Sequence, residues 1–319
     1  MDWKSSLAKS LCIAAMTFAM ATTAHAAALR TFVSGFGNDS NTATNCSHAQ
    51  PCRTFAMAVT VTASGGEIEA LDPAGYGPIT ITGPLTLVGL PGAAINAPSG
   101  GNGITINAGP NDAVHVQGLL IDGSGVGADG ILFNTGGSLK VFDCTIKNFL
   151  YNGIYVGALN GMSLLVTNTV ITGISSTANS SGVYFYNGSS AGLSVAALDN
   201  LTLSDNSVGI SLYAIGGPVE ALISNSQILN SPVGLVTQGL SSNTAAVTVA
   251  LKGDRFNLTT QGIHLAGYTA AYLSQVTQFT APGLTLGISM DGAGNSALAD
   301  GTNHFTSTPG VTFGTWISQ

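Results

Sequence analysis

The sequence has little charge and no cluster of positive charge. Asp, Glu, Lys and Arg together make up 7% of the 319 residues, and the formal net charge is −7. Phosphate binding needs grouped Lys and Arg, so we expect no nucleic-acid partner. The hydrophobic share of 45% argues against a disordered chain, because enough apolar surface is present to offset the entropy lost on folding.

Beyond the first 26 residues, no segment is apolar over the length needed to cross a membrane. Residues 1–26 predict a secretory signal. Lys4 and Lys9 supply its positive start, Leu11 to Ala21 its apolar run, and Ala24-His25-Ala26 its cleavage site. The apolar run is short for a bilayer. We therefore expect a secreted or periplasmic protein without a membrane span.

Cysteine is scarce, with four residues in all. Cys12 leaves with the predicted signal, and in an oxidising compartment the close pair Cys46 and Cys52 is expected to form a disulfide. A zinc site is the alternative for this pair, but neither a Cys-x-x-Cys motif nor paired His accompanies it. Cys144 is expected to be a buried thiol. The sequence predicts no metal site.

Glycine is abundant, with 42 residues, and it recurs at a regular period. A tetrad of Gly, a large aliphatic, any residue and usually another apolar one occurs eight times, 23 to 29 residues apart. This period indicates stacked repeats, each too small to bury its own apolar face. The tetrads begin at Gly103, Gly130, Gly153, Gly182, Gly209, Gly234, Gly262 and Gly287.

Each repeat holds three short apolar stretches separated by turns. A turn residue that tolerates left-handed backbone precedes the middle stretch in several repeats. Three strands and three turns predict a triangular coil, and stacking pairs equivalent strands in parallel at ~4.8 Å. Roughly nine coils would give a rod on the order of 45 Å long. The turn residues are Asp143, Asn168, Asn200 and Asn225.

The ends of such a rod need covering, because open strand edges promote aggregation. Residues from Pro51 to Ala63 predict a short capping helix that Gly65-Gly66 ends. We therefore expect a signal at 1–26 and a single domain at 27–319. Its amino-terminal cap should cover 27–66, its coils 67–292 and its carboxy-terminal cap 293–319.

The period, the Gly-Ile tetrads and the Asn-bearing turns resemble the right-handed parallel β-helix superfamily that includes pectate lyases. The segments Pro51-Cys52-Arg53-Thr54-Phe55, Gly65-Gly66-Glu67-Ile68 and Leu71 to Pro78 are similar to the amino-terminal part of exported bacterial β-helix repeat proteins. The resemblance implies an all-β, right-handed parallel β-helix. It also implies polysaccharide as the usual ligand, cleaved by the lyases and hydrolases of the superfamily.

Asp122, Asp129 and Asp143 are the candidate catalytic residues. A glycosidase needs two carboxylates roughly 5–10 Å apart, and neighbouring coils could bring two of the three onto one rim. Lys147 is the nearest cation. The superfamily's polygalacturonase pattern (Asn-Thr-Asp, Asp-Asp, Gly-His-Gly and Arg-x-Lys) has no counterpart here. The resemblance implies calcium as a cofactor if the chain is a lyase, and otherwise none is expected.

Tyrosines form the candidate ligand-binding set. The third residue of each tetrad should point outward; Tyr155 and Tyr184 hold this place on adjacent coils, and Tyr186 and Tyr213 pair similarly beside them. Such aromatics suit the apolar faces of sugar rings, or they stack on each other for about 0.5–1.5 kcal/mol per pair.

The preferred hypothesis from the sequence is an exported protein that binds polysaccharide or surface glycan without cleaving it. A polysaccharide lyase or glycoside hydrolase is one alternative, and a structural surface or adhesion module is another. The sequence leaves enzyme activity and oligomeric state open.

Overall fold

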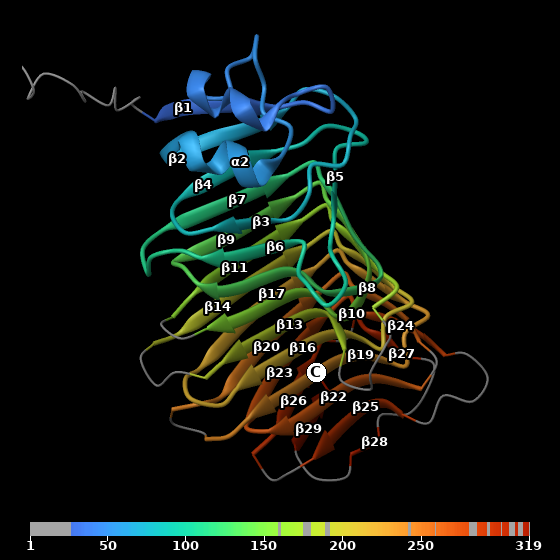
Figure 1. Cartoon of the computed structure of the whole chain (residues 1–319). Helices are drawn as coiled ribbons and strands as arrows, with labels where there is room; N and C mark the ends of the chain where they lie inside the picture. The colour runs from blue at the N-terminus through green and yellow to red at the C-terminus, as the bar shows by residue number, and fades with distance from the viewer. Residues whose placement is uncertain are drawn as a thin grey trace, which may run out of the picture.

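The computed structural model describes residues 27–158, 161–174, 180–188, 192–241, 244–258, 260–280, 286–291, 294–300, 302–305, 310–311 and 315–318. Over these residues the chain winds as a coil, and its strands pair in parallel with their equivalents in the coils before and after. Figure 1 shows the coils stacked into a rod, from β1 and α2 at one end to β29 at the other. The fold is an all-β, right-handed parallel β-helix, so the predicted fold class is confirmed.

The strands form three rows, one along each side of the coil. The first row is a twelve-stranded sheet that contains β1 (Ala28–Val33), β2 (Thr62–Ala70), β4 (Leu85–Val88), β7 (Ala113–Gln117), β9 (Ser138–Phe142), β11 (Ser163–Thr167), β14 (Ser194–Asp199), β17 (Val219–Ser224), β20 (Val247–Lys252), β23 (Thr269–Ser274), β26 (Ser296–Ala299) and β29 (Thr315–Ser318).

The second row, called here the tetrad row because its strands carry the tetrads, contains β3 (Ile79–Ile81), β6 (Ile104–Asn107), β8 (Leu120–Thr135), β10 (Thr145–Ala158), β13 (Ser181–Asn187), β16 (Val208–Ala214), β19 (Val233–Gly239), β22 (Gln261–Gly267), β25 (Leu286–Asp291) and β28 (Gly310–Val311). The third, the short-strand row, contains β5 (Ala94–Asn96), β12 (Val170–Thr172), β15 (Thr202–Ser204), β18 (Gln227–Leu229), β21 (Arg255–Leu258), β24 (Thr277–Thr280) and β27 (His304–Phe305). Strands β8 and β10 bend around the corner between these two rows and belong to both.

A glycine begins each tetrad because neighbouring coils approach closely there. A Cβ on Gly153 would lie 2.6 Å from the carbonyl oxygen of Gly182 and 2.4 Å from Cγ2 of Ile171. The aliphatic residue that follows points into the core, and Ile154 and Val183 are fully buried. The order Gly-aliphatic therefore reflects a backbone contact followed at once by a core side chain.

The corner between the twelve-stranded sheet and the short-strand row is built from left-handed residues. Asp143, Asn168, Asn200 and Asn225 have φ angles of 52°, 52°, 53° and 52°. Their side chains also bond from coil to coil, since Asn168 Nδ2 donates to Asp143 Oδ1 at 3.2 Å and Asn200 Nδ2 donates to Asn168 Oδ1 at 2.7 Å. The role predicted for these turn residues is confirmed.

The number of coils differs slightly from the roughly nine predicted from the sequence. Strands continue into both ranges expected as caps. Strand β1 lies within 27–66, and β26 and β29 lie within 293–319. The first strand of the rod is thus paired with β2 rather than replaced by a helix.

The capping helix is shorter than the predicted range from Pro51 to Ala63. Helix α2 covers Phe55–Ala58 and passes into the 3₁₀ turn η2 (Val59–Val61), and another 3₁₀ turn, η1 (Asp39–Thr44), precedes it. The side chain of Thr54 caps α2 by accepting the N–H of Met57. The β-branched residues of η2 disfavour continuation of the helix.

Gly65 and Gly66, expected to end the helix, lie within β2 instead. Gly65 has a φ of 75°, and a Cβ on Gly66 would lie 2.8 Å from the carbonyl oxygen of Leu29. The pair allows a close approach of β1 to β2. None of the helices in the described ranges is long and apolar enough to cross a membrane, and the predicted signal lies outside those ranges.

Cys46 and Cys52 form a disulfide, with 4.9 Å between their Cα atoms. Both are fully buried beside the first strand, where the N–H of Phe32 donates to the carbonyl oxygen of Cys46 and the N–H of Ser34 to that of Cys52. Cys144 is a buried free thiol. Both predictions, the disulfide and the buried thiol, are confirmed.

Replacing Cys46 and Cys52 together with serine is expected to lower the free energy of unfolding by about 2 kcal/mol, because the disulfide restricts a short loop in the unfolded chain. Denaturant unfolding of the wild type and the variant would measure the difference. Reductant should shift the wild type toward the variant and leave the variant unchanged. A wild type that unfolds identically with and without reductant would contradict the prediction.

Candidate functional site

Three tyrosine rings stack across neighbouring coils of the tetrad row. Tyr155 in β10 and Tyr184 in β13 are backbone partners, and their ring centroids lie 5.3 Å apart with 5° between the ring planes. Tyr213 in β16 adds a third ring, 5.2 Å from Tyr184 at an angle of 22°. We call these three residues the tyrosine stack. Each is half-buried, so part of each side chain faces solvent.

The stacked rings are nearly parallel but shifted sideways relative to one another. Aromatic planes in contact lie about 3.5 Å apart. A centroid separation of 5.3 Å therefore leaves a sideways offset of about 4 Å between parallel rings in contact. Aromatic pairs prefer this arrangement over full face-to-face overlap. Because each ring covers only part of the next one, the stack combines mutual packing with an apolar strip that a ligand can reach.

Tyr186 lies beside the stack. Its backbone pairs with Gly157 and with Tyr213, as the spacing of the tetrads predicts. The ring of Tyr213 nevertheless stacks on Tyr184, its diagonal neighbour. Backbone register therefore predicts which residues are adjacent, whereas the ring contacts also depend on how each side chain lies along its strand.

Two glycines make room for the tyrosine rings. A Cβ on Gly157 would lie 3.0 Å from Cε1 of Tyr155, and a Cβ on Gly188 would lie 2.4 Å from Cε1 of Tyr186. Each ring therefore lies along its own strand, over the glycine two positions later. This role of the glycines was not predicted from the sequence. Its signal is the Tyr-x-Gly spacing, which occurs at Tyr155 and again at Tyr186.

The tyrosine hydroxyls stay protonated at neutral pH. Burial, together with the neighbouring tyrosines, raises the pKa of Tyr184 to about 12. Burial also raises the pKa of Tyr155, with smaller contributions from Tyr186 and Asp129, and burial raises the pKa of Tyr213. The stack therefore presents neutral hydroxyls, each able to donate and accept a hydrogen bond.

Asp129, one of the candidate catalytic residues, lies in the tetrad row close to Tyr155. Its Oδ1 accepts a hydrogen bond of 2.8 Å from Asn152 Nδ2, and its N–H donates to Asn102 Oδ1 at 3.2 Å. Asn152 Oδ1 in turn accepts the N–H of Ser181 at 3.3 Å. Burial raises the pKa of Asp129, against the effect of its bonds from Asn152. These side chains connect successive coils along one edge of the tyrosine stack.

Asp122 pairs with Lys147, the candidate cation, at 3.3 Å between Nζ and Oδ2. Both lie in the parts of β8 and β10 that belong to the short-strand row, and they are backbone partners. Burial acts to raise the pKa of Asp122. The N–H of Ser124, the amide of Asn148 and Lys147 outweigh that effect and lower it. Asp122 is thus an ionised carboxylate held in an ion pair.

Asp143 occupies the left-handed corner before β10, where its Oδ1 accepts from Asn168. Asp122, Asp129 and Asp143 therefore stand in three different settings: the short-strand row, the tetrad row and a corner. The structure brings Lys147 to Asp122. Within the described ranges, no hydrogen bond or ion pair links any of the three carboxylates to another.

Farther along the tetrad row, His264 Nε2 lies 2.8 Å from Asp291 Oδ2, and Asp291 is exposed. His264 holds the outward tetrad position that the sequence pattern assigns to it. In the part of the chain that the structure describes, no three His, Cys, Asp or Glu residues gather to hold a metal ion.

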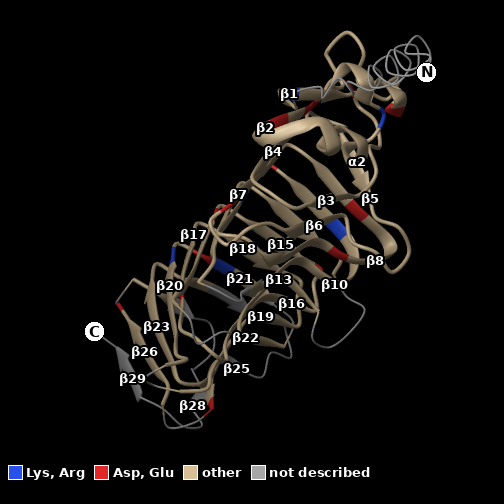
Figure 2. Cartoon of the chain, turned by 60° about the vertical axis from the view of Figure 1, so that its left-hand side comes forward, with Lys and Arg blue, Asp and Glu red and all other residues tan. Residues whose placement is uncertain are grey.

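No Lys or Arg lies in the strand segments that carry the tetrads. The chain has eight of these residues; Lys4 and Lys9 fall within residues 1–26, and all of the others lie in the described ranges. Figure 2 shows how sparse the charges are along the coils. The remaining cations lie at the amino-terminal end, in the twelve-stranded sheet or in the short-strand row: Arg30, Arg53, Lys140, Lys147, Lys252 and Arg255.

The fold is similar to that of a solved pectate lyase, Pel9A, with a TM-score of 0.57 and 14% sequence identity, over 91% of this chain and 78% of that one. A chain described as Geobacillus virus E2 ORF18 aligns with a TM-score of 0.43 and 15% identity, over 81% of this chain and 55% of its own length. No protein-family model matches the sequence, and no curated protein matches it. At this identity the likeness to Pel9A shows the fold, a right-handed parallel β-helix.

Proposed function

We propose that the tyrosine stack binds a neutral polysaccharide or glycan and does not cleave it. The observation that carries the proposal is the stack itself: three half-buried rings in offset contact on one face of adjacent coils. Sugar rings offer apolar C–H faces that pack on such a strip, and an extended apolar surface usually has a purpose. The neutral tyrosine hydroxyls at its border supply hydrogen bonds.

The charges around the stack favour a neutral ligand over an acidic one. The strand segments that carry the tetrads hold no Lys or Arg to pair with a uronate, and Asp129 adds a carboxyl group beside Tyr155. An acidic chain laid along this row would bring like charges together without compensation. Neutral hexose or N-acetylhexosamine chains meet no such repulsion.

A pocket lies in line with the stack, toward the amino-terminal end. Its volume is about 250 Å³, and α2 and η2 form one of its walls. Thr80 and Thr105 line it, and Thr105 pairs with Leu132, which pairs with Tyr155. From Thr80 in β3 to Tyr213 in β16 the row advances by five strand spacings, or about 24 Å. That length accommodates several sugar rings, with the pocket as one end of the path.

The absence of cleavage in this proposal rests on the carboxylates. Asp122 is held by Lys147 and Asn148, and Asp143 by Asn168, away from the tetrad row. Asp129 stands in that row with an amide as its partner. A two-carboxylate mechanism needs a second acid roughly 5–10 Å away across the scissile bond, and the other two candidates, Asp122 and Asp143, lie in the short-strand row and at a corner.

A polysaccharide lyase is the alternative, favoured by the ion pair of Asp122 with Lys147 and by the fold likeness to a pectate lyase. The purified chain should be incubated with neutral and acidic polysaccharides, with and without calcium. Retention of neutral chains without products supports binding. Calcium-dependent release of unsaturated products from an acidic chain, lost in Lys147→Met, would establish the lyase instead.

Export is part of the proposal. It is supported by the signal pattern of residues 1–26 and by the disulfide between Cys46 and Cys52, a bond that persists in oxidising compartments. Amino-terminal sequencing of the protein recovered from outside the cytoplasm should begin at Ala27. An uncleaved protein confined to the cytoplasm would contradict export.

Replacing Tyr155 and Tyr184 together with alanine is expected to weaken glycan retention at least tenfold, or by about 1.4 kcal/mol, because it removes two of the three rings that form the strip. Affinity electrophoresis in gels containing neutral polysaccharide would measure the effect. Tyr151→Ala is the matched control, since Tyr151 is 49% exposed and lies outside the stack. Equal retention by the double variant and the control would contradict the proposal.

A further inference from the structure

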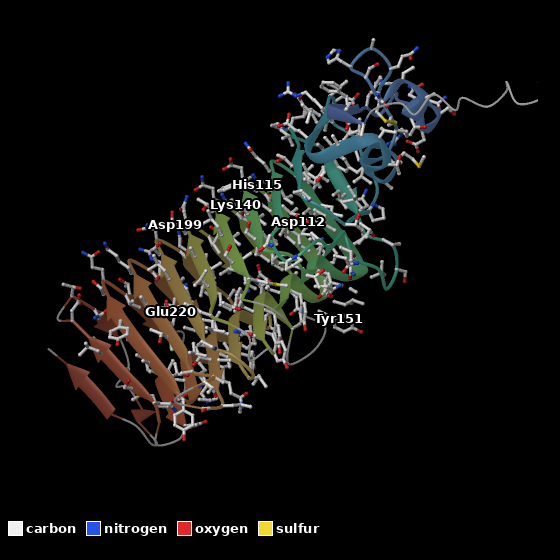
Figure 3. All side chains as sticks on the ribbon, turned by 90° about the vertical axis from the view of Figure 1, so that its left-hand side faces the viewer. Asp112, His115, Lys140, Tyr151, Asp199 and Glu220 are labelled. Carbon is white, nitrogen blue, oxygen red and sulfur yellow. A yellow bond between two sulfur atoms is a disulfide. The ribbon has the colours of Figure 1, made fainter. Side chains whose placement is uncertain are left out.

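The outer face of the twelve-stranded sheet changes from polar to apolar along the rod. The middle positions of neighbouring strands are backbone partners. The polar residues His115 and Lys140 hold this position first, Leu165 follows, and the later strands carry apolar residues there. Figure 3 looks onto this face and labels His115 and Lys140 toward the amino-terminal half. The apolar continuation, from β14 to β26, is Ala197, Leu222, Ala250, Tyr272 and Leu298.

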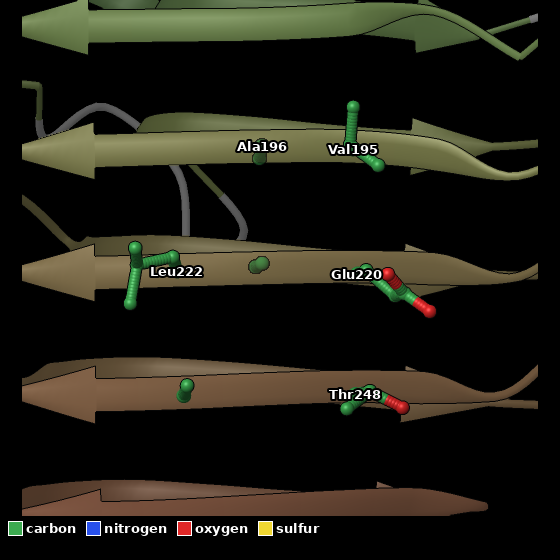
Figure 4. Close-up of a pocket in the computed structure, with 7 residues that line it drawn as sticks. Val195, Ala196, Glu220, Leu222 and Thr248 are labelled. Carbon is green, nitrogen blue, oxygen red and sulfur yellow. The ribbon is translucent and has the colours of Figure 1, made fainter.

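Small and large side chains alternate from Ala197 to Tyr272, and Leu298 follows as a second large residue. Leu222 is 46% exposed and Tyr272 is 48% exposed, whereas the positions before each of them are alanines. Two adjoining hollows of about 320 Å³ and about 310 Å³ result, and Leu222 and Ala250 line both. Figure 4 shows the side chain of Leu222 on β17, where it lines the first hollow. From Ala197 to Tyr272 the surface is therefore a row of protruding side chains (knobs) separated by hollows (holes).

We infer that this face binds a second copy of the chain about a two-fold axis that lies in the interface, runs along the strands and passes between β17 and β20. Such an axis reverses the order of the coils in the second copy. Leu222 then faces Ala250 of the second copy, and Tyr272 faces Ala197 of the second copy. Leu222 and Tyr272 each enter a hole beside an alanine, whereas Leu165 meets Leu298 of the second copy as an apolar pair at each end of the interface. The two-fold symmetry makes every contact twice.

The alternation of sizes selects this axis over the other simple choice. A two-fold axis along the rod would place Leu222 against Leu222 and Tyr272 against Tyr272, with alanines facing alanines. Knobs would then collide while voids remained between them, which close packing does not allow. Two sheets pack face to face at about 10 Å when their side chains interdigitate.

The polar residues on either side of the apolar stretch complement one another about the same axis. Ser224 and Lys252 are backbone partners on β17 and β20, so Lys252 of the second copy faces Ser224. Asp199 lies one coil from Ser224, or about 4.8 Å, within reach of that lysine. Asp199 already accepts from Ser224 and Asn225 on Oδ1. On the opposite side Glu220 faces Thr248 of the second copy.

The area suits a reversible dimer. The six strands from β11 to β26, each about five residues across, cover about 29 Å by 17 Å. Two copies together bury roughly 1,000 Å², near the lower limit for specific interfaces. The tyrosine stack belongs to a different row, so the dimer leaves two stacks exposed. The inference therefore stands or fails independently of the proposed glycan binding.

Sedimentation velocity of the purified chain from about 1 to 200 μM, a range chosen for an interface of this size, tests the inference. The wild type should pass from monomer to dimer within it. Leu222→Lys and Ala250→Glu should each remain monomeric, because each buries an unpaired charge. An equimolar mixture of the two variants should recover the dimer, since the introduced lysine faces the introduced glutamate at one of the two symmetric contacts.

Thr86→Lys is the matched control, because Thr86 holds the same middle position on β4, outside the apolar stretch, and it should dimerise like the wild type. A wild type that stays monomeric throughout would overturn the inference. A dimer that survives both single variants, or a mixture that stays monomeric, would overturn it as well. Capture of another apolar ligand by a monomeric wild type would identify a different occupant for this face.

Discussion

Gly153→Ala is expected to destabilise the protein by about 3 kcal/mol, although it adds a single methyl group. The new Cβ would lie 2.4 Å from Cγ2 of Ile171 and 2.6 Å from the carbonyl oxygen of Gly182. The second of these atoms is backbone in the neighbouring coil, so it cannot turn aside as a flexible side chain would. The coils would have to separate at a point where parallel strands hold them together.

Gly83→Ala provides the comparison, because a Cβ at Gly83 meets no atom within 4 Å. Its free energy of unfolding should stay within about 0.5 kcal/mol of the wild type. Urea unfolding of the two variants beside the wild type would measure both effects. Similar stabilities for the two variants would show that close approach between coils is not the reason for glycine in the tetrads.

Asp254 is expected to make stability depend on pH. Its side chain is buried, and Oδ1 and Oδ2 accept the N–H groups of Ser226 at 2.8 Å and Lys252 at 3.0 Å. Burial raises the pKa of Asp254 from 3.8 to about 7, against the effect of these two N–H groups. Between those two values the folded state binds more protons than the unfolded state. Stability should therefore fall as pH rises from about 4 to about 7 and then level off.

A pKa change from 3.8 to about 7 corresponds to about 4 kcal/mol of stability lost across that interval. Asp254→Ser should remove this loss. Ser226 holds the equivalent place one coil earlier, where its hydroxyl accepts the N–H of Leu201 and donates to the carbonyl oxygen of Ser224. A serine therefore suits the position.

Urea unfolding at pH 4, 6 and 8 would test the prediction. The free energy of unfolding of the variant should rise relative to that of the wild type as pH increases. Carboxyl groups with lowered pKa values, such as Asp122, change stability only at pH values below the ordinary carboxyl pKa. They are present in both proteins, so their effect cancels in the comparison. If the free energies of unfolding of the two proteins change with pH in parallel, ionisation of Asp254 does not destabilise the folded state and the prediction is wrong.

The fold could be predicted because its rules are local and repeated. Each tetrad combines a glycine at a close approach with a buried aliphatic, as at Gly153 and Ile154, and each corner needs a left-handed residue such as Asn168. The amino-terminal helix was overestimated because its apolar residues continue into η2 and β2 without a change in composition. There the glycine pair at 65–66 serves strand pairing rather than termination.

The candidate site was predictable in part. Alternation along a strand indicates that Tyr155 and Tyr184 point outward on adjacent coils, and their rings do stack. Alternation does not indicate how a ring lies along its strand. The contact of Tyr213 with Tyr184 and the space above Gly157 were therefore not predictable from the sequence. The roles of the aspartates were less predictable, because an aspartate can form an ion pair, as Asp122 does, or occupy a left-handed turn, as Asp143 does.

Parallel pairing of each coil with only its nearest neighbours has a consequence for how such a chain changes over generations. A duplicated segment of one full turn would meet a matching surface above and below, so the rod could lengthen without redesign of its interior. Duplication of a tyrosine-bearing turn would extend the aromatic strip by one ring. Loss of such a turn would shorten the strip and leave the remaining coils joined as before.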